Sequence, residues 1–261
     1  MGLLNHLLCN QLHYKLIDKK RIIKHMKKKL IFIIFLVGIE CFPQKFKAEY
    51  RIEKIPTQFD SEKTSNMMSN LFSSAEKFSL MLYAEKNNSI FYVEKQMEDI
   101  QSSMDNLSLI FFKINGKIYT YLDENIQLHE KNSFGSNFII ENKYKSQYWE
   151  LTSESKVIGD YKCFKAVFYE TTLKNNKIVI WYAPSLNYSY GPAAFVGFPG
   201  LVLEVEVLNK LPYRIVLDNI KFNYSKEIDY SKPKNGKYIT LDEYNEIGEK
   251  MRQRQKELYK N

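Results

Sequence analysis

The chain has 261 residues, of which 44% are apolar, 15% aromatic and 26% charged. This is a globular composition that excludes a disordered chain, and the counts of only 10 Gly and 7 Pro exclude collagen-like and low-complexity architectures. The formal net charge of +8 resides mainly in residues 1–44, which carry +6, so residues 45–261 carry +2. We therefore expect no nucleic-acid partner for the larger part.

The N-terminal region has the pattern of a secretory signal peptide. Three lysines, at 27–29, follow Met26 and precede the apolar run 30–39. That run is too short to span a bilayer as a helix. We expect a signal peptide over 26–44, cleaved after Gln44, and an extension over 1–25 ahead of a true start at Met26. The mature chain would have no transmembrane span and would be exported to the periplasm or the outer membrane, with secretion as an alternative.

Cys41 offers a second interpretation of the leader, as a lipidated first residue that would give peripheral membrane association. The residues before it, 38–40, do not fit a lipobox. Of the three cysteines, only Cys163 lies beyond the leader, so no intrachain disulfide is expected there. We expect Cys163 to be a packed thiol in a strand.

Beyond the leader, short runs of Ile, Val, Tyr and Phe separated by turn residues predict a β-rich single domain over 45–261. In the run 201–208, Leu and Val alternate with Glu204 and Glu206, which predicts one buried and one solvated face. Asn115-Gly116 predicts a two-residue hairpin. The expected strands are 46–54, 77–84, 89–95, 107–114, 117–122, 126–130, 137–145, 163–171, 177–183, 201–208 and 213–222.

The C-terminal stretch 240–259 predicts an amphipathic helix. Thr240 and Glu243 form a capping-box pattern, and apolar residues then recur at helical spacing. We expect this helix to pack on its own sheet rather than on a partner. The polar stretches 61–74 and 94–105 are compatible with either a short helix or a loop.

The search for catalytic motifs is largely negative. His129 is the single histidine after the leader, which excludes multi-histidine zinc sites, and we expect no metal and no cofactor. Nucleophile-elbow, phosphate-loop and dinucleotide-binding motifs are absent from the sequence. A hydrolase built from scattered carboxylates, or from Cys163 with His129, remains as an alternative, although a solvent-facing His129 is the expectation.

The segment 181–204 differs from the rest, because it holds three of the ten glycines and three of the seven prolines. Such residues define a specifically shaped connection between two strands. Within it, 197–202 reads GFPGLV and resembles the hexapeptide that gives the GLPGLI family its name. We assign a structural role to Gly191, Pro192, Gly197, Phe198, Pro199, Gly200, Leu201 and Val202, and possible contacts with a ligand or partner to Trp181, Tyr190, Phe195 and Phe198.

The resemblance implies an exported, mainly β protein of two-membrane bacteria, with no catalytic residues to carry over and a link to outer-membrane receptor genes. The expected fold is a curved antiparallel sheet or open half-barrel of about ten strands with a C-terminal helix. Its apolar concavity would be a site for binding. The expected function is a non-enzymatic envelope module that binds a partner protein or hydrophobic ligand. The alternatives are a structural or chaperone-like component linked to outer-membrane receptors, and the hydrolase.

Overall fold

The computed structural model describes residues 45–57, 62–94, 103–144, 149–169, 177–209 and 211–258. The chain divides into two units, Met1–Pro43 and Gln44–Asn261, and every described residue belongs to the second. The expected signal peptide, the extension before it and Cys41 lie outside the described residues. Within the described part, no helix is both long and apolar enough to cross a membrane.

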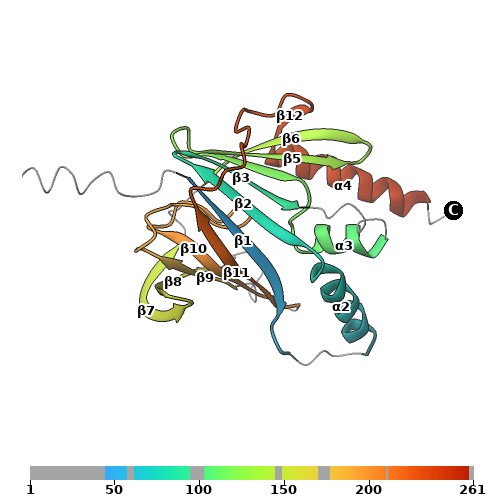
Figure 1. Ribbon diagram of the computed structural model, residues 1–261. Coiled ribbons are helices and arrows are strands. Elements are labelled where there is room, and N and C mark those ends of the chain that lie inside the picture. Colours follow the sequence, from blue (N-terminus) through green and yellow to red (C-terminus); the bar gives the residue numbers. More distant parts are fainter. Residues whose placement is uncertain are drawn as a thin grey trace, which may run out of the picture. The chain divides into compact units, whose positions relative to one another are not determined.

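The described residues form one open sheet of twelve strands, which confirms the predicted fold class (Figure 1). The order is β12-β6-β5-β4-β3-β2-β1-β11-β10-β9-β8-β7, and all neighbours are antiparallel except β12 and β6. The strands are β1 (Lys45–Lys54), β2 (Ser79–Glu85), β3 (Asn88–Glu94), β4 (Lys117–Tyr121), β5 (Ile126–Ser133), β6 (Ser136–Lys143), β7 (Glu150–Ile158), β8 (Tyr161–Tyr169), β9 (Lys177–Ala183), β10 (Leu201–Leu208), β11 (Tyr213–Phe222) and β12 (Lys237–Thr240).

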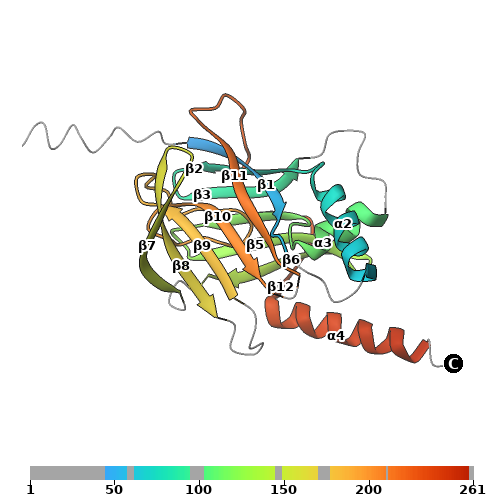
Figure 2. The ribbon, with the colours of Figure 1, turned by 90° about the horizontal axis from the view of Figure 1, so that it is seen from below.

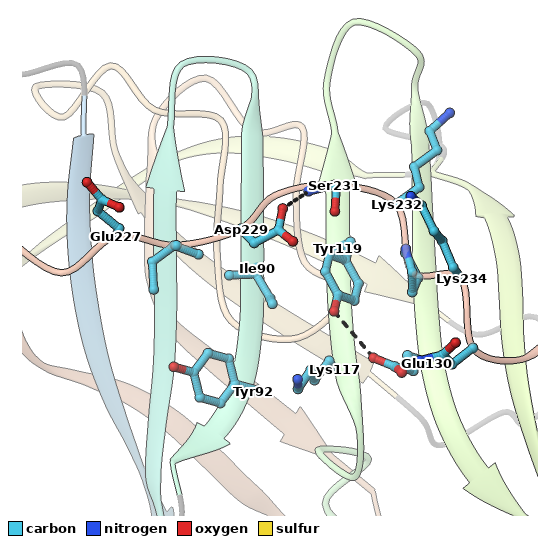
Figure 3. Close-up of a pocket in the computed structure, with 13 residues that line it drawn as sticks. Ile90, Tyr92, Lys117, Tyr119, Glu130, Glu227, Asp229, Ser231, Lys232 and Lys234 are labelled. Carbon is cyan, nitrogen blue, oxygen red and sulfur yellow. Dashed lines mark hydrogen bonds between the residues drawn. The ribbon is translucent and has the colours of Figure 1, made fainter.

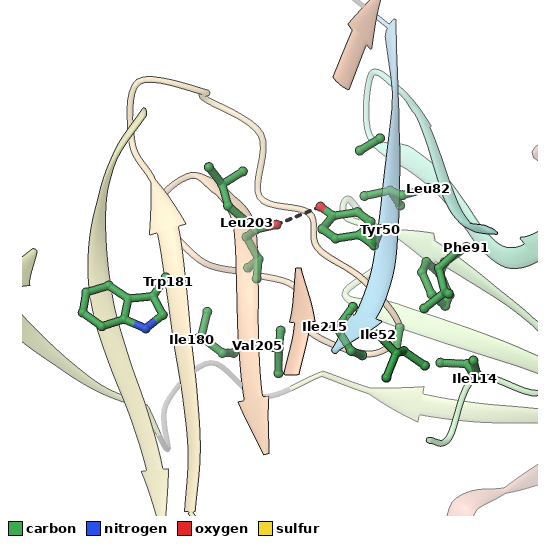
Figure 4. Packing of buried hydrophobic residues seen from close by; sticks show 14 of the residues in the cluster. Tyr50, Ile52, Leu82, Phe91, Ile114, Ile180, Trp181, Leu203, Val205 and Ile215 are labelled. Carbon is green, nitrogen blue, oxygen red and sulfur yellow. Dashed lines mark hydrogen bonds between the residues drawn. The ribbon is translucent and has the colours of Figure 1, made fainter. Parts of the chain in front are cut away.

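Strand β1 joins the two halves of the sheet, between β2 and β11. Its sequence alternates strictly, so that Phe46, Ala48, Tyr50 and Ile52 face the main core while charged residues point to the other face. The buried Tyr50 hydroxyl donates a hydrogen bond to the backbone oxygen of Val202 at 2.7 Å (Figure 4). This bond ties the centre of the sheet to the start of β10.

Two helices pack together over the apolar face: α2 (Glu62–Ala75) and α3 (Ser103–Phe111). The Ser108 hydroxyl donates to the backbone oxygen of Leu71 at 3.1 Å, and the Ser74 hydroxyl donates to Asp105. The expected strand 107–114 is therefore wrong, and so is the hairpin at 115–116. A short apolar run has no decisive period of its own, and packing against α2 makes this one helical.

The helix α4 (Leu241–Leu258) confirms the predicted C-terminal helix, including its cap. The Thr240 N–H donates to Glu243 Oε2 at 2.7 Å, and the Glu243 N–H donates to Thr240 Oγ1 at 3.2 Å. Tyr244 and Ile247 pack on a small cluster from β6 and β12, whereas Leu258 is 73% exposed. The helix thus packs on its own sheet only through its first half, and it extends beyond the sheet edge (Figure 2).

The strands β2 to β5 are covered on both faces. One face joins the main core, and the other carries a second cluster built from Met81, Tyr83, Ile90, Tyr119, Tyr121, Ile126, Leu128, Ile139 and Tyr224. The segment 223–236, which connects β11 to β12, crosses this second face, and Ile228 and Tyr230 pack on the cluster. The Tyr121 hydroxyl donates to the backbone oxygen of Tyr230 at 3.0 Å, which holds the crossing segment against the sheet.

Candidate functional site

The connection 184–200 between β9 and β10 is folded onto the core through close backbone contacts. A Cβ atom on Gly191 would lie 2.4 Å from the Phe195 backbone oxygen and 2.6 Å from the Val202 Cβ. A Cβ atom on Gly200, whose φ is +150°, would lie 2.3 Å from the Ala183 backbone oxygen. Leu201 and Val202 are fully buried, Pro192 is buried, and Gly197 has a φ of 85°. The chain can follow this path only with glycine at the close approaches.

The aromatic side chains of this connection face inward. Phe198 is 3% exposed and packs edge-on against Trp149 with ring centroids 5.0 Å apart. Tyr190 is 1% exposed, and its hydroxyl donates to the Lys86 backbone oxygen at 3.0 Å. Phe195 is half-buried and lies 6.4 Å from the Trp149 ring, and Pro199 is exposed. The tertiary structure thus places these side chains in or against the core, and a role in ligand contact for Tyr190 and Phe198 stays a prediction.

Trp181, the remaining predicted contact residue, belongs to a charged cluster on the opposite face of β9 and β10. Its Nε1 donates to Glu206 Oε1 at 3.0 Å, and the Lys156 ammonium lies 4.3 Å from the centre of its ring. Lys156 reaches this position from the edge strand β7 and also donates to Glu204 Oε2 at 2.9 Å. The face that the alternation of 201–208 predicts to be solvated is therefore partly closed, because Lys156 lies over it.

Glu204 is the most buried carboxylate of this charged cluster. Its side chain is 5% exposed, and its Oε1 has no hydrogen-bond partner among the described residues, with Arg214 Nη1 at 3.9 Å. Burial raises the pKa of Glu204, the Lys156 ammonium opposes that rise, and Glu206 adds to it. The arrangement stores an electrostatic cost in the ionised form, which is a property of stability.

Cys163 and His129 lie on β8 and β5, towards opposite ends of the strand order. Cys163 is fully buried, and burial raises the pKa of its thiol to about 11, which favours the inert form. His129 is half-buried rather than solvent-facing, and its Nε2 lies 2.7 Å from the Asn115 backbone oxygen. The two residues thus have separate partners within the described sheet. The described residues also contain no group of three or more metal-ligating side chains.

A groove of about 580 Å³ lies between strands β3 to β5 and the crossing segment 223–236 (Figure 3). We call it the tyrosine groove. Its floor comes from β3, β4 and β5, and its wall comes from the crossing segment. It is lined by Ile90, Tyr92, Lys117, Tyr119, Glu130, Glu227, Ile228, Asp229, Ser231, Lys232, Pro233, Lys234 and Asn235.

The two tyrosines on the floor are held in fixed orientations. The Tyr92 ring stacks on Tyr83, with centroids 5.8 Å apart and planes at 16°, and Tyr83 in turn meets the edge of Tyr224. The Tyr119 hydroxyl donates to Glu130 Oε2 at 3.3 Å, and burial followed by the nearby Glu130 charge raises the pKa of Tyr119 to about 12. The phenol therefore stays protonated and remains a donor near neutral pH.

The wall of the groove is fixed by contacts of its own. Asp229 accepts a hydrogen bond from the Ser231 N–H at 2.8 Å (Figure 3). Lys232 pairs with Glu124 at 2.6 Å and lies 5.4 Å from the Tyr121 ring centre. The Tyr238 hydroxyl donates to the Pro233 backbone oxygen at 2.7 Å. A preformed polar hollow with aromatic side chains is a typical binding site.

Sequence reasoning placed none of the groove residues. The expected apolar concavity is filled, since α2, α3 and the connection 184–200 pack on that face. One signal did exist in the run Ile90-Phe91-Tyr92-Val93, because consecutive apolar residues are typical of a strand covered on both faces. The covering segment itself has no pattern that marks it as a wall.

No protein-family model matches this chain, and no curated protein matches it significantly. Among solved structures, PNGF-II in its P21 crystal form is similar with a TM-score of 0.50 and 16% identity, over 78% of this chain and 33% of that chain. The C2 crystal form gives 0.49 and 15% identity, over 78% of this chain and 32% of that chain. An uncharacterised conserved protein from Thermus thermophilus gives 0.36 and 8%, over 76% and 91%. This chain therefore spans about a third of PNGF-II, and the likeness shows the fold alone.

Proposed function

We propose that this chain is an exported, non-enzymatic binding module of the GLPGLI family and that the tyrosine groove is its binding site. The observation that carries the proposal is a polar hollow of about 580 Å³ whose rings and charged groups are held before any ligand arrives. Sites for small ligands have volumes of about 300–1,000 Å³ and are largely preformed, which lowers the entropy cost of binding.

The composition of the groove changes the expected ligand. Because α2, α3 and the connection 184–200 occupy the main apolar face, the exposed hollow is the polar one. We therefore propose a polar ligand rather than a hydrophobic one. The resemblance of 197–202 to the family hexapeptide supports membership of the family and an envelope location, and it gives that segment a structural role.

The test is native mass spectrometry of the full chain recovered gently from the envelope of cells that express it. Asn235→Trp places a bulky ring in the groove, and Asn219→Trp adds the same ring to the exposed surface of β11 as a matched control. We expect a bound mass with the unchanged chain and with Asn219→Trp, and none with Asn235→Trp. A bound mass that persists in Asn235→Trp, or its absence from the unchanged chain, would contradict the proposal.

A further inference from the structure

The strands that form the groove floor have no free backbone to offer. β3 pairs with β2 and β4, β4 pairs with β3 and β5, and β5 pairs with β4 and β6. A peptide that binds by adding a strand needs an unpaired edge. Recognition in the groove must therefore come from side chains and from the crossing segment, which disfavours an extended peptide as the ligand.

The ionisable side chains that line the groove balance one another. Lys117, Lys232 and Lys234 face the hollow together with Glu130, Glu227 and Asp229. Lys117 and Glu130 are direct neighbours in the pairing of β4 with β5. Several of these groups already have partners, since Glu130 accepts from Tyr119 and Lys232 pairs with Glu124. A lining with both signs and no excess of either attracts neither a polyanion nor a polycation.

The tyrosines add what a neutral, hydroxyl-rich molecule requires. Each ring offers an apolar surface, and each phenol offers a donor and an acceptor. The Tyr92 ring is half-buried and held by its stack on Tyr83, so little side-chain freedom would be lost when a ligand packs on it. Sugars present C–H surfaces flanked by hydroxyl groups that both donate and accept hydrogen bonds, which complements rings bordered by carboxylates and ammonium groups.

We propose that the tyrosine groove binds a neutral oligosaccharide, with Tyr92 as the ring on which a sugar packs. The inference rests on the proposed binding function and narrows it to one class of ligand. The charged side chains act as hydrogen-bond partners for hydroxyl groups, so the affinity for the sugar depends little on ionic strength. A charged ligand in the same groove would give a strong dependence.

The experiment is calorimetric titration of the full chain with maltotriose, cellotriose and N,N′,N″-triacetylchitotriose, with trigalacturonate as the charged comparison. We expect at least one neutral sugar to bind, with an affinity that is unchanged when salt is raised from about 0.05 to about 0.5 M. Tyr92→Ala should weaken that sugar about tenfold, whereas Tyr92→Phe keeps the ring and should retain most of the affinity. Tyr161→Ala, which removes a ring from β8, is the matched control and should have no effect.

Asn235→Trp, which blocks the hollow without removing a core contact, distinguishes loss of the groove from loss of the fold. Its circular dichroism should match the unchanged chain while sugar binding is lost. Equal sugar binding by Asn235→Trp, or binding of trigalacturonate in preference to every neutral sugar, overturns the ligand class. If no sugar binds but the co-purified mass is still lost in Asn235→Trp, the sugar inference is wrong and the binding function stands. If neither binding nor a co-purified mass is found, both fail.

Discussion

At the scale of single residues, Gly191 and the charged cluster around Glu204 make the most specific demands. Gly191 has an ordinary φ, so only space matters there, and the nearest atoms would lie 2.4 and 2.6 Å from an added Cβ. Glu204 is nearly fully buried, and one of its oxygens lacks a hydrogen bond within the described part of the chain. These two positions test packing and electrostatics separately.

Gly191→Ala should lower the free energy of unfolding by about 3 kcal/mol or more, since a backbone oxygen and the buried Val202 must move. Gly135→Ala is the matched control, because Gly135 has a φ of +74° but no atom within 4 Å of an added Cβ. It should cost about 1 kcal/mol, from backbone conformation alone. Chemical denaturation of both variants measures the difference, and equal losses would show that close packing at Gly191 is not the determinant.

Glu204→Gln should make the fold more stable at pH 7. The folded-state pKa of Glu204 is raised above the ordinary 4.5, so the folded chain binds this proton more tightly than the unfolded chain. The ionised form therefore costs stability above the folded pKa, and that cost disappears as the pH falls towards 4.5. Thermal melts at pH 7 and near pH 4 should show an advantage for Glu204→Gln only at the higher pH.

Lys156→Met should have the opposite effect at pH 7, a loss of about 2 kcal/mol, because it removes the cation that compensates Glu204. Combined with Glu204→Gln, most of the loss should be recovered, since no buried charge then remains uncompensated. A double-mutant cycle measures this coupling. Additive effects of the two substitutions would show that the ion pair does not govern the cluster.

At the scale of elements, helix α4 divides into a packed half and a free half. Tyr244 and Ile247 contact the cluster of Phe138, Ile140 and Ile239, whereas Met251 and Leu258 are 39% and 73% exposed. The amphipathic pattern that predicts the helix does not distinguish these halves. Only the length of β6 and β12 beneath it decides where packing stops.

Ile247→Ala should lower the free energy of unfolding by about 1–2 kcal/mol, as expected for a half-buried aliphatic side chain. Leu258→Ala removes a more exposed side chain from the same helix and should change the free energy by less than about 0.5 kcal/mol. Urea denaturation of the two variants provides the comparison. A similar loss for Leu258→Ala would mean that the second half of α4 packs on something in solution.

At the scale of the whole molecule, the response to pH near neutrality depends on His129, the single histidine in residues 45–261. Burial lowers its pKa below the ordinary 6.5, and its Nε2–H donates to Asn115. The unfolded chain therefore binds a proton more readily than the folded one. Stability is complete above pH 6.5 and falls as the pH drops below that value towards the folded pKa.

His129→Gln keeps a donor for the Asn115 oxygen but does not titrate, so the decline in melting temperature between about pH 7 and pH 5 should flatten in this variant. Glu204 acts in the opposite direction towards the acid end, and combining His129→Gln with Glu204→Gln separates the two. An unchanged slope in His129→Gln would show that other groups set the acid response.

Most of the fold was predictable from local pattern, and the candidate site was not. The strands 177–183, 201–208 and 213–222 have the predicted bounds, because alternation in an antiparallel sheet with one buried face is visible in sequence. β7 and β12 were missed, since an edge strand with mostly exposed residues and a strand of four residues leave little apolar pattern. The run 107–114 was misassigned because its partner, α2, is distant in sequence.

The sequence by itself determined the β-rich class, the capped C-terminal helix and the glycine-dependent connection at 184–200, since each is written in local spacing or in residues with special backbone freedom. Only the tertiary structure decided that Tyr190 and Phe198 belong to the core, that Lys156 reaches across to Glu204, and that the segment 223–236 forms a groove with Tyr92 and Tyr119. These are contacts between residues far apart along the chain. Which face a side chain shares with which neighbour follows from strand order and curvature, and neither is encoded in local periodicity.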